Sequence, residues 1–87
     1  MSYEVSVSVM LKPGIADPQG QTIERALPAL GYTGVDDVRV GKLIHLTLDA
    51  EDAADAERRV NEMCEKLLAN TVIESFEVTI HEYSAHE

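Results

Sequence analysis

The sequence predicts an α+β protein in which helices cover one face of a mostly antiparallel sheet. Apolar and polar residues alternate near both ends of the chain, and apolar residues recur at helical spacing in two segments between them, 17–31 and 49–70. One-sided helices and alternating strands together require two layers. No Pro/Gly/Ser-rich linker interrupts the 87 residues. We therefore expect a single domain, 1–87, whose last residues, 83–87, form a flexible tail.

The first strand and the first helix lie close together in the chain. Residues 3–11 alternate between two faces, with three valines and Leu11 on one and two serines and Met10 on the other, which predicts a half-buried strand. Asp17 is expected to cap a helix that begins at Pro18, where the missing N–H of proline costs nothing. Pro28 should weaken the last turn of this helix, and Gly31 should follow its end.

The segment 35–49 is a second β region whose shape the sequence leaves open. Its apolar residues from Val38 to Leu48 occupy even positions, apart from Leu43. A hairpin with the two-residue loop Gly41-Lys42 would put those after the loop on the opposite face from those before it, so this hairpin is disfavoured. Two options remain, namely a loop with an odd number of residues or one long strand that bends at Gly41.

A longer helix and a last strand complete the chain. Acidic residues over 49–52 supply its N-terminal cap. Asn70 is expected to end the helix in the left-handed conformation, and alternation over 76–81 predicts the last strand. The helix carries one apolar stripe, made of Ala53, Ala56, Val60, Met63, Cys64, Leu67 and Leu68.

The element order is therefore β-α-β(β)-α-β, the ferredoxin-like arrangement, a two-layer sandwich with two helices on one face of the sheet. If the segment 35–49 stays straight, each β-α-β half could instead pair with the half of a second chain. Strand exchange of this kind is an inexpensive route to a dimer.

Composition excludes several classes of function. The net charge of −9 argues against nucleic acid, whose phosphates need clustered Lys and Arg. A single cysteine allows neither an internal disulfide nor a multi-thiolate zinc site. No apolar run approaches the ~20 residues of a membrane span, and no leader pattern opens the chain. We expect a cytoplasmic protein without membrane contact.

Catalytic patterns are also missing. The sixteen carboxylates fall mostly on expected solvent faces and caps. His45 and His81 lie on strands, away from the apolar face, and His86 lies in the tail, so no metal site is expected. Cys64 belongs to the apolar stripe and is expected to fill core volume rather than to act as a nucleophile.

Two expected turns, which we call corners, each contain a lysine close to a glycine, although lysines are scarce in this acidic protein. Pro13 and Gly14 follow Lys12, and Gly41 precedes Lys42. Turn chemistry alone accounts for the proline and the glycines. The lysines are therefore candidate contacts with an acidic partner or an anion.

Five short motifs follow one another along the chain: Leu11-Lys12-Pro13-Gly14, Asp17-Pro18-Gln19-Gly20, Leu30-Gly31-Tyr32, Val38-Arg39-Val40-Gly41-Lys42, and Cys64 to Asn70 followed by Val72-Ile73-Glu74. Together they resemble the PurS family, the small subunit of phosphoribosylformylglycinamidine synthase. The resemblance runs from about Val5 to Ile80, with the motifs in the family's order. Pro28 and Thr71 depart from the family pattern without affecting the assignment.

The resemblance implies a non-catalytic subunit that bridges a glutaminase subunit and a large ATP-dependent synthetase subunit and assists ammonia transfer between them in purine biosynthesis. It implies a homodimer or higher homo-oligomer. ATP and Mg would be used by the large subunit, so no cofactor is expected in this chain. Candidate partner contacts lie at the corners and in the motifs: Lys12, Pro13, Gly14, Asp17, Arg39, Gly41, Lys42 and Asn70.

Two alternatives share the layered topology. An ACT-like regulatory domain that senses small molecules rests on analogy of fold alone. An acylphosphatase-like enzyme would need an arginine in the first loop, and Lys12 to Ala16 contains none.

Overall fold

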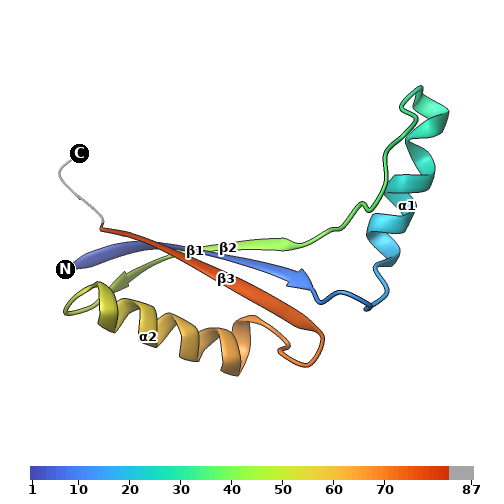
Figure 1. Ribbon diagram of the computed structural model, residues 1–87. Coiled ribbons are helices and arrows are strands. Elements are labelled where there is room, and N and C mark those ends of the chain that lie inside the picture. Colours follow the sequence, from blue (N-terminus) through green and yellow to red (C-terminus); the bar gives the residue numbers. More distant parts are fainter. Residues whose placement is uncertain (83–87) are drawn as a thin grey trace.

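The computed structural model describes residues 1–82, and the predicted tail, 83–87, lies outside them. Its centre is a three-stranded antiparallel sheet, in which β1 (Ser2–Leu11) lies between β2 (Lys42–Asp49) and β3 (Glu74–Glu82) (Figure 1). The α+β class and the antiparallel sheet expected from the sequence are confirmed. The elements are β1 (Ser2–Leu11), α1 (Pro18–Ala26), the 3-10 turn η1 (Pro28–Leu30), β2 (Lys42–Asp49), α2 (Ala53–Met63), the π turn η2 (Cys64–Leu68) and β3 (Glu74–Glu82).

Strand β1 forms the middle of the sheet and carries most of the core. Val5, Val7 and Val9 are buried, whereas the residues between them face away from the core. Val7 lies opposite Ile44 of β2 and Val78 of β3. The alternation read from the sequence is thus the inside–outside alternation of a sheet with one covered face.

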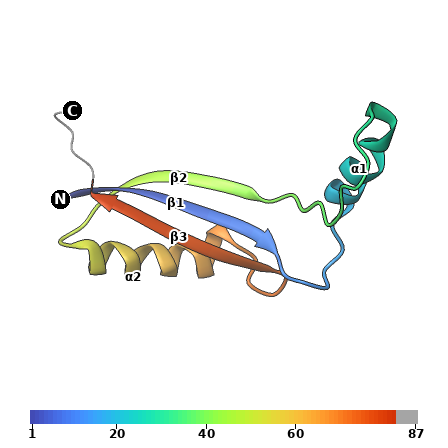
Figure 2. The ribbon, with the colours of Figure 1, turned by 45° about the horizontal axis from the view of Figure 1, so that its top comes forward.

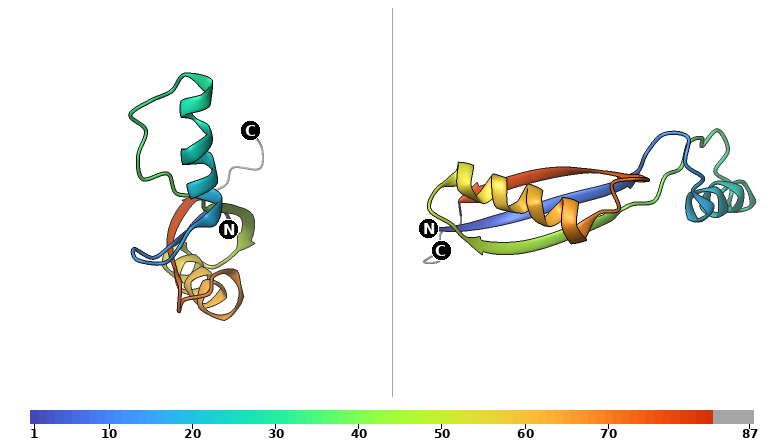
Figure 3. Two further views of the ribbon diagram at one scale, coloured as in Figure 1. Left: turned by 90° about the vertical axis from the view of Figure 1, so that its right-hand side faces the viewer. Right: turned by 90° about the horizontal axis from the view of Figure 1, so that it is seen from below.

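Helix α2 covers that face (Figures 1 and 3). Asp52 caps it, as the acidic segment predicted, by accepting a hydrogen bond from the Asp55 backbone N–H at 2.7 Å. Ala56, Val60 and Cys64 are fully buried against the valines of β1. The middle of the predicted stripe therefore supplies the other half of the core, whereas Ala53, at the start of the stripe, is exposed.

The stripe departs from the prediction at η2. Here the Ala69 N–H bonds to the Cys64 carbonyl five residues back, at 3.0 Å, instead of four. This wider turn rotates Leu67 out of the apolar face, so its side chain is 82% exposed, while Leu68 packs against the core and Ala69 is buried. The expectation that Leu67 lies in the core was wrong for this reason.

Asn70 is not in the left-handed conformation, because Asp37 is the only non-glycine residue among 1–82 with positive φ. The Asn70 carbonyl instead accepts hydrogen bonds from the N–H groups of Ile73 and Glu74, at 3.0 and 2.7 Å. Its side chain accepts another from Val72, at 3.2 Å. These bonds reverse the chain into β3.

Helix α1 begins as predicted, with Asp17 as cap and Pro18 in its first turn, and it ends at Ala26 before Pro28. The sequence placed both helices on one face of the sheet, but only α2 lies there. Helix α1 projects beyond the end of the sheet (Figures 1 and 2). Strands β1 and β2 are antiparallel neighbours, so the chain leaves β1 at Leu11 and enters β2 at Lys42 at the same end of the sheet. Residues 12–41, which include α1, therefore lie beyond that end.

The segment 35–49 contains one strand and no hairpin. Residues before Lys42 run from α1 to the sheet outside the hydrogen-bonded ladder, and β2 begins there. The additional strand that the predicted order allowed within residues 35–49 is therefore absent from the sheet of one chain. In the part of the chain that is described, no helix is both long and apolar enough to span a bilayer.

Candidate docking site at the junction of the sheet and helix α1

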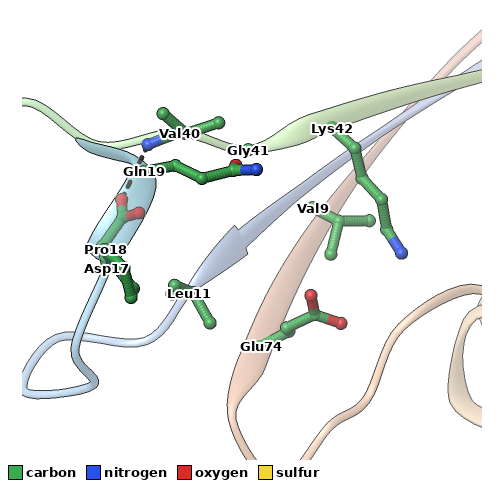
Figure 4. Close-up of a pocket in the computed structure, with 9 residues that line it drawn as sticks. All are labelled: Val9, Leu11, Asp17, Pro18, Gln19, Val40, Gly41, Lys42 and Glu74. Carbon is green, nitrogen blue, oxygen red and sulfur yellow. Dashed lines mark hydrogen bonds between the residues drawn. The ribbon is translucent and has the colours of Figure 1, made fainter. Parts of the chain in front are cut away.

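The predicted partner contacts gather at one end of the sheet. At this end β1 finishes, β2 and β3 begin, and α1 starts. A hollow of about 270 Å³ lies between these elements (Figure 4). Its lining is Val9, Leu11, Asp17, Pro18, Gln19, Val40, Gly41, Lys42 and Glu74.

Asp17 is the one buried charged side chain among residues 1–82, at 7% exposure. Its Oδ1 accepts a hydrogen bond from the Gly20 N–H at 3.0 Å, and its Oδ2 accepts one from the Val40 N–H at 2.8 Å. These two backbone hydrogen bonds hold the pKa of Asp17 below its usual range, aided by nearby Arg39 and opposed by burial. Asp17 is thus an ionised acceptor that ties the start of α1 to the returning chain.

Arg39 ties the same segment to the end of β1. Its Nη2 donates to the carbonyl oxygens of Leu11 and Lys12, at 3.1 and 3.3 Å. Its Nε lies 3.7 Å from Asp17 Oδ2 and is buried without a hydrogen-bond partner in the described chain. Arg39 therefore uses its Nη2 group to bind the protein's own backbone.

Glycines permit the close approach of these segments. A Cβ on Gly41 would overlap the Met10 sulfur and stand 2.6 Å from the Val9 carbonyl oxygen. A Cβ on Gly20 would overlap the Val38 carbonyl oxygen. Both positions are closed to any larger residue unless the backbone moves.

The corner at Pro13-Gly14 is a turn, as its residues predicted. The Ile15 N–H bonds to the Lys12 carbonyl at 3.2 Å, and Gly14 has φ of 88°. Proline followed by a residue with positive φ is the pattern of a type II turn. Pro13 and Gly14 therefore direct the chain from β1 toward α1.

The two lysines differ in their surroundings. Lys12 Nζ donates to the Thr71 carbonyl at 2.7 Å, which fastens the end of β1 to the turn that begins at Asn70. Lys42 is exposed at the start of β2 and makes no ion pair within residues 1–82. At the mouth of the hollow, Lys42 and Glu74 offer one charge of each sign (Figure 4).

An apolar surface adjoins the hollow. Along α1 and η1, Ile23 is 44% exposed and Leu30 is 71% exposed. A second, shallower hollow of about 440 Å³ lies on this helix against Val40 and is mostly apolar. Large exposed apolar areas mark surfaces that another protein covers.

This arrangement suits docking better than chemistry. Both oxygens of Asp17 already accept backbone hydrogen bonds, and no cluster of three His, Cys, Asp or Glu in residues 1–82 could hold a metal ion. Cys64 lies in the core, where burial, with a smaller effect of Glu65, raises the pKa of its thiol. His45 and His81 are exposed on the sheet face opposite α2, and His86 lies outside the described residues.

Three further residues of the junction were not among the candidate contacts predicted from the sequence. Glu24 Oε1 accepts a hydrogen bond from the Val38 N–H at 3.1 Å, and Gln19 and Glu74 line the hollow. The signal for Glu24 is its spacing: it lies seven residues after Asp17, on the same side of a helix. Gly20, a poor helix former near the start of α1, likewise signals a close approach.

Comparison with known proteins gives a consistent family. The family model PurS, described as phosphoribosylformylglycinamidine (FGAM) synthase, matches residues 4–82. The PurS subunit of that synthase from Bacillus subtilis is 47% identical over 83 residues, 95% of this chain and 98% of the relative. The PurS subunit from Synechocystis is 49% identical over 80 residues, 90% of this chain and 80% of the relative.

Solved structures agree with these relatives. Bacillus subtilis PurS superposes with a TM-score of 0.82 at 48% identity, covering 92% of this chain and 99% of that one. A chain of the PurLQS structure from Thermotoga maritima superposes with a TM-score of 0.85 at 36% identity, covering 93% and 99%.

Proposed function

The chain belongs to the PurS family and is a subunit of phosphoribosylformylglycinamidine synthase, and from this premise we propose that it is a non-catalytic scaffold within the enzyme. The observation that carries the proposal is the match to PurS subunits over nearly the whole of both chains. A PurS chain occurs in a structure named PurLQS, so the partners we propose are the glutaminase and the large synthetase subunit. The cytoplasm is the proposed location.

The scaffold bridges those two subunits so that ammonia passes between their sites. Ammonia in water near neutral pH is mostly protonated, and the cation has no lone pair with which to attack. A closed, water-poor path keeps it neutral and prevents leakage. A part that closes such a path needs complementary surfaces rather than a reactive group. The junction supports this role, because Asp17 and Arg39 are bonded to backbone while apolar side chains of α1 and η1 are exposed.

ATP and Mg belong, in this proposal, to the large subunit and not to this chain. An ACT-like sensing role is not favoured, since the comparisons lead to PurS subunits.

We also propose that two copies exchange their projecting arms, defined as residues 12–41. The ferredoxin-like order has four strands, whereas the sheet of one chain has three and leaves an edge of β2 unpaired. On β2, Ile44, Leu46 and Leu48 remain only half-buried. The arm of a second copy carries both a strand-like segment and a helix with exposed apolar residues, which are the two missing parts.

Native mass spectrometry of the chain, alone and mixed with the other two subunits, tests the self-association that arm exchange requires and the bridging role. We expect a homo-oligomer alone and a three-component complex in the mixture. A chain that joins only one of the two subunits, whichever is added first, would contradict a bridging role.

A further inference from the structure

Two carboxylates of the arm are bonded to the backbone of one short segment, 38–40. Asp17 accepts from the Val40 N–H at 2.8 Å, and Glu24 accepts from the Val38 N–H at 3.1 Å. Both acceptors belong to α1 or its cap. Side chains of the helix thus take the place that a neighbouring strand would have along this segment.

The two bonded N–H groups lie on the same side of the segment. In extended chain, the polar groups of alternate residues share an edge, so those of residues 38 and 40 face α1. Gly20 lets the helix approach this edge, because a Cβ there would overlap the Val38 carbonyl oxygen. The edge that faces α1 is therefore occupied.

The opposite edge is open. Within residues 1–82, the backbone groups of Arg39 and Gly41 make no hydrogen bond to other backbone or side chains. The side chain of Arg39 is held elsewhere, on the carbonyls of Leu11 and Lys12. A short run of strand with one edge blocked and one edge free can accept a partner from one side only.

We propose that Asp17 and Glu24 are positioning residues that block one edge of the segment 38–41, so that its other edge pairs with the free edge of β2 in a second copy. This inference rests on the proposed arm exchange and adds to it the residues that orient the exchanged strand. Main-chain pairing at a sheet edge then gives the affinity, and Val38 and Val40 bring apolar side chains toward the half-buried residues of β2.

Asp17→Asn is the informative variant. Asparagine is as good a helix cap as aspartate, so Oδ1 can still accept from Gly20. The second oxygen becomes an NH₂ group, which would then face the Val40 N–H, donor against donor. The variant therefore breaks the link to the segment while α1 and its cap remain.

Glu24 supplies a matched pair of variants. Glu24→Gln keeps a carbonyl oxygen that can turn toward Val38, so it is the conservative control. Glu24→Ala removes the acceptor and leaves the cap of α1 untouched. This pair carries the test by itself if Asp17→Asn fails to fold.

The measurements are the dimer dissociation constant, by analytical ultracentrifugation, and amide hydrogen exchange resolved by residue. We expect a wild-type dimer in which Val40 is protected at all concentrations and Arg39 and Gly41 only when dimeric. Asp17→Asn and Glu24→Ala should each weaken the dimer about tenfold or more, with Glu24→Gln close to wild type.

Two failures are distinguishable. A wild-type chain that stays monomeric would overturn the arm exchange itself. A wild-type dimer whose affinity and protection at Arg39 and Gly41 are unchanged in both Asp17→Asn and Glu24→Ala would overturn the positioning role alone.

Discussion

We expect the replacement of Gly20 by alanine to lower the free energy of unfolding, although this substitution usually stabilises a helix. On an exposed helix, glycine to alanine stabilises by about 1 kcal/mol, because glycine loses more backbone freedom on folding. Here the new Cβ would overlap the Val38 carbonyl oxygen and stand 2.7 Å from Asp17 Oδ2. The obstacle is backbone rather than a flexible side chain, so overpacking should cost about 2–3 kcal/mol, toward the upper end of its usual range. The net expectation is a loss of about 1–2 kcal/mol.

The assay is urea unfolding at one fixed protein concentration, with Gln21→Ala as the control in the same helix. Gln21 is exposed, so its replacement should change the free energy of unfolding by only a few tenths of a kcal/mol. Amide exchange at Val38 and Val40 reports whether α1 has moved from the segment. A Gly20→Ala protein that is about 1 kcal/mol more stable than wild type, with both amides still protected, would refute the reasoning.

Three further experiments test other parts of this interpretation, namely lysine substitution, acid titration and cysteine alkylation. Lys42→Ala should change the free energy of unfolding by less than about 0.5 kcal/mol, whereas Lys12→Ala should lower it by at most about 1 kcal/mol through the lost hydrogen bond to Thr71. Both variants should nevertheless weaken assembly with the other subunits. Native mass spectra that show the full complex with both variants would contradict this expectation. Because the pKa of Asp17 is lowered on folding, its ionised form stabilises the fold above the usual aspartate range, and this contribution disappears as pH falls through the lowered value. The stability difference between wild type and Asp17→Asn should thus shrink below about pH 4 in acid titrations followed by circular dichroism, and a constant difference would count against it. Cys64, buried and with a raised thiol pKa, should resist alkylation at pH 8 until the chain is unfolded, so rapid labelling of the native protein is the contrary result.

The elements that depend on local pattern could be predicted from the sequence. The valines of β1 alternate with period two, and the caps at Asp17 and Asp52 are local bonds between a side chain and the next turn. The burial of Cys64 also followed from its place in a helical stripe. Each of these depends on residues only a few positions apart.

The placement of α1 and the exposure of Leu67 could not be predicted in this way. Helix α1 has an ordinary one-sided pattern, and nothing in that pattern says whether its apolar face is covered by its own sheet or by another chain. A π turn differs from an α turn by one residue, and the apolar spacing around Cys64 predicted α-helix where the structure has a π turn. Tertiary and quaternary packing decide such cases.

The candidate site was located by its corners but not by its bonds. The sequence pointed to the correct end of the sheet through two turns that contain lysine and glycine, Lys12 to Gly14 and Gly41-Lys42. The acceptors at Asp17 and Glu24, however, bind backbone N–H groups of Val38 and Val40. Every residue except proline has such a group, so the residue types do not indicate which backbone N–H groups these carboxylates bind.

Reconstitution of the synthase from separately purified subunits tests the scaffold role most directly. With glutamine as the nitrogen source, activity should depend on this chain, whereas with ammonia supplied in solution the large subunit should work without it. Glutamine-dependent synthesis at an equal rate when this chain is left out would contradict the account.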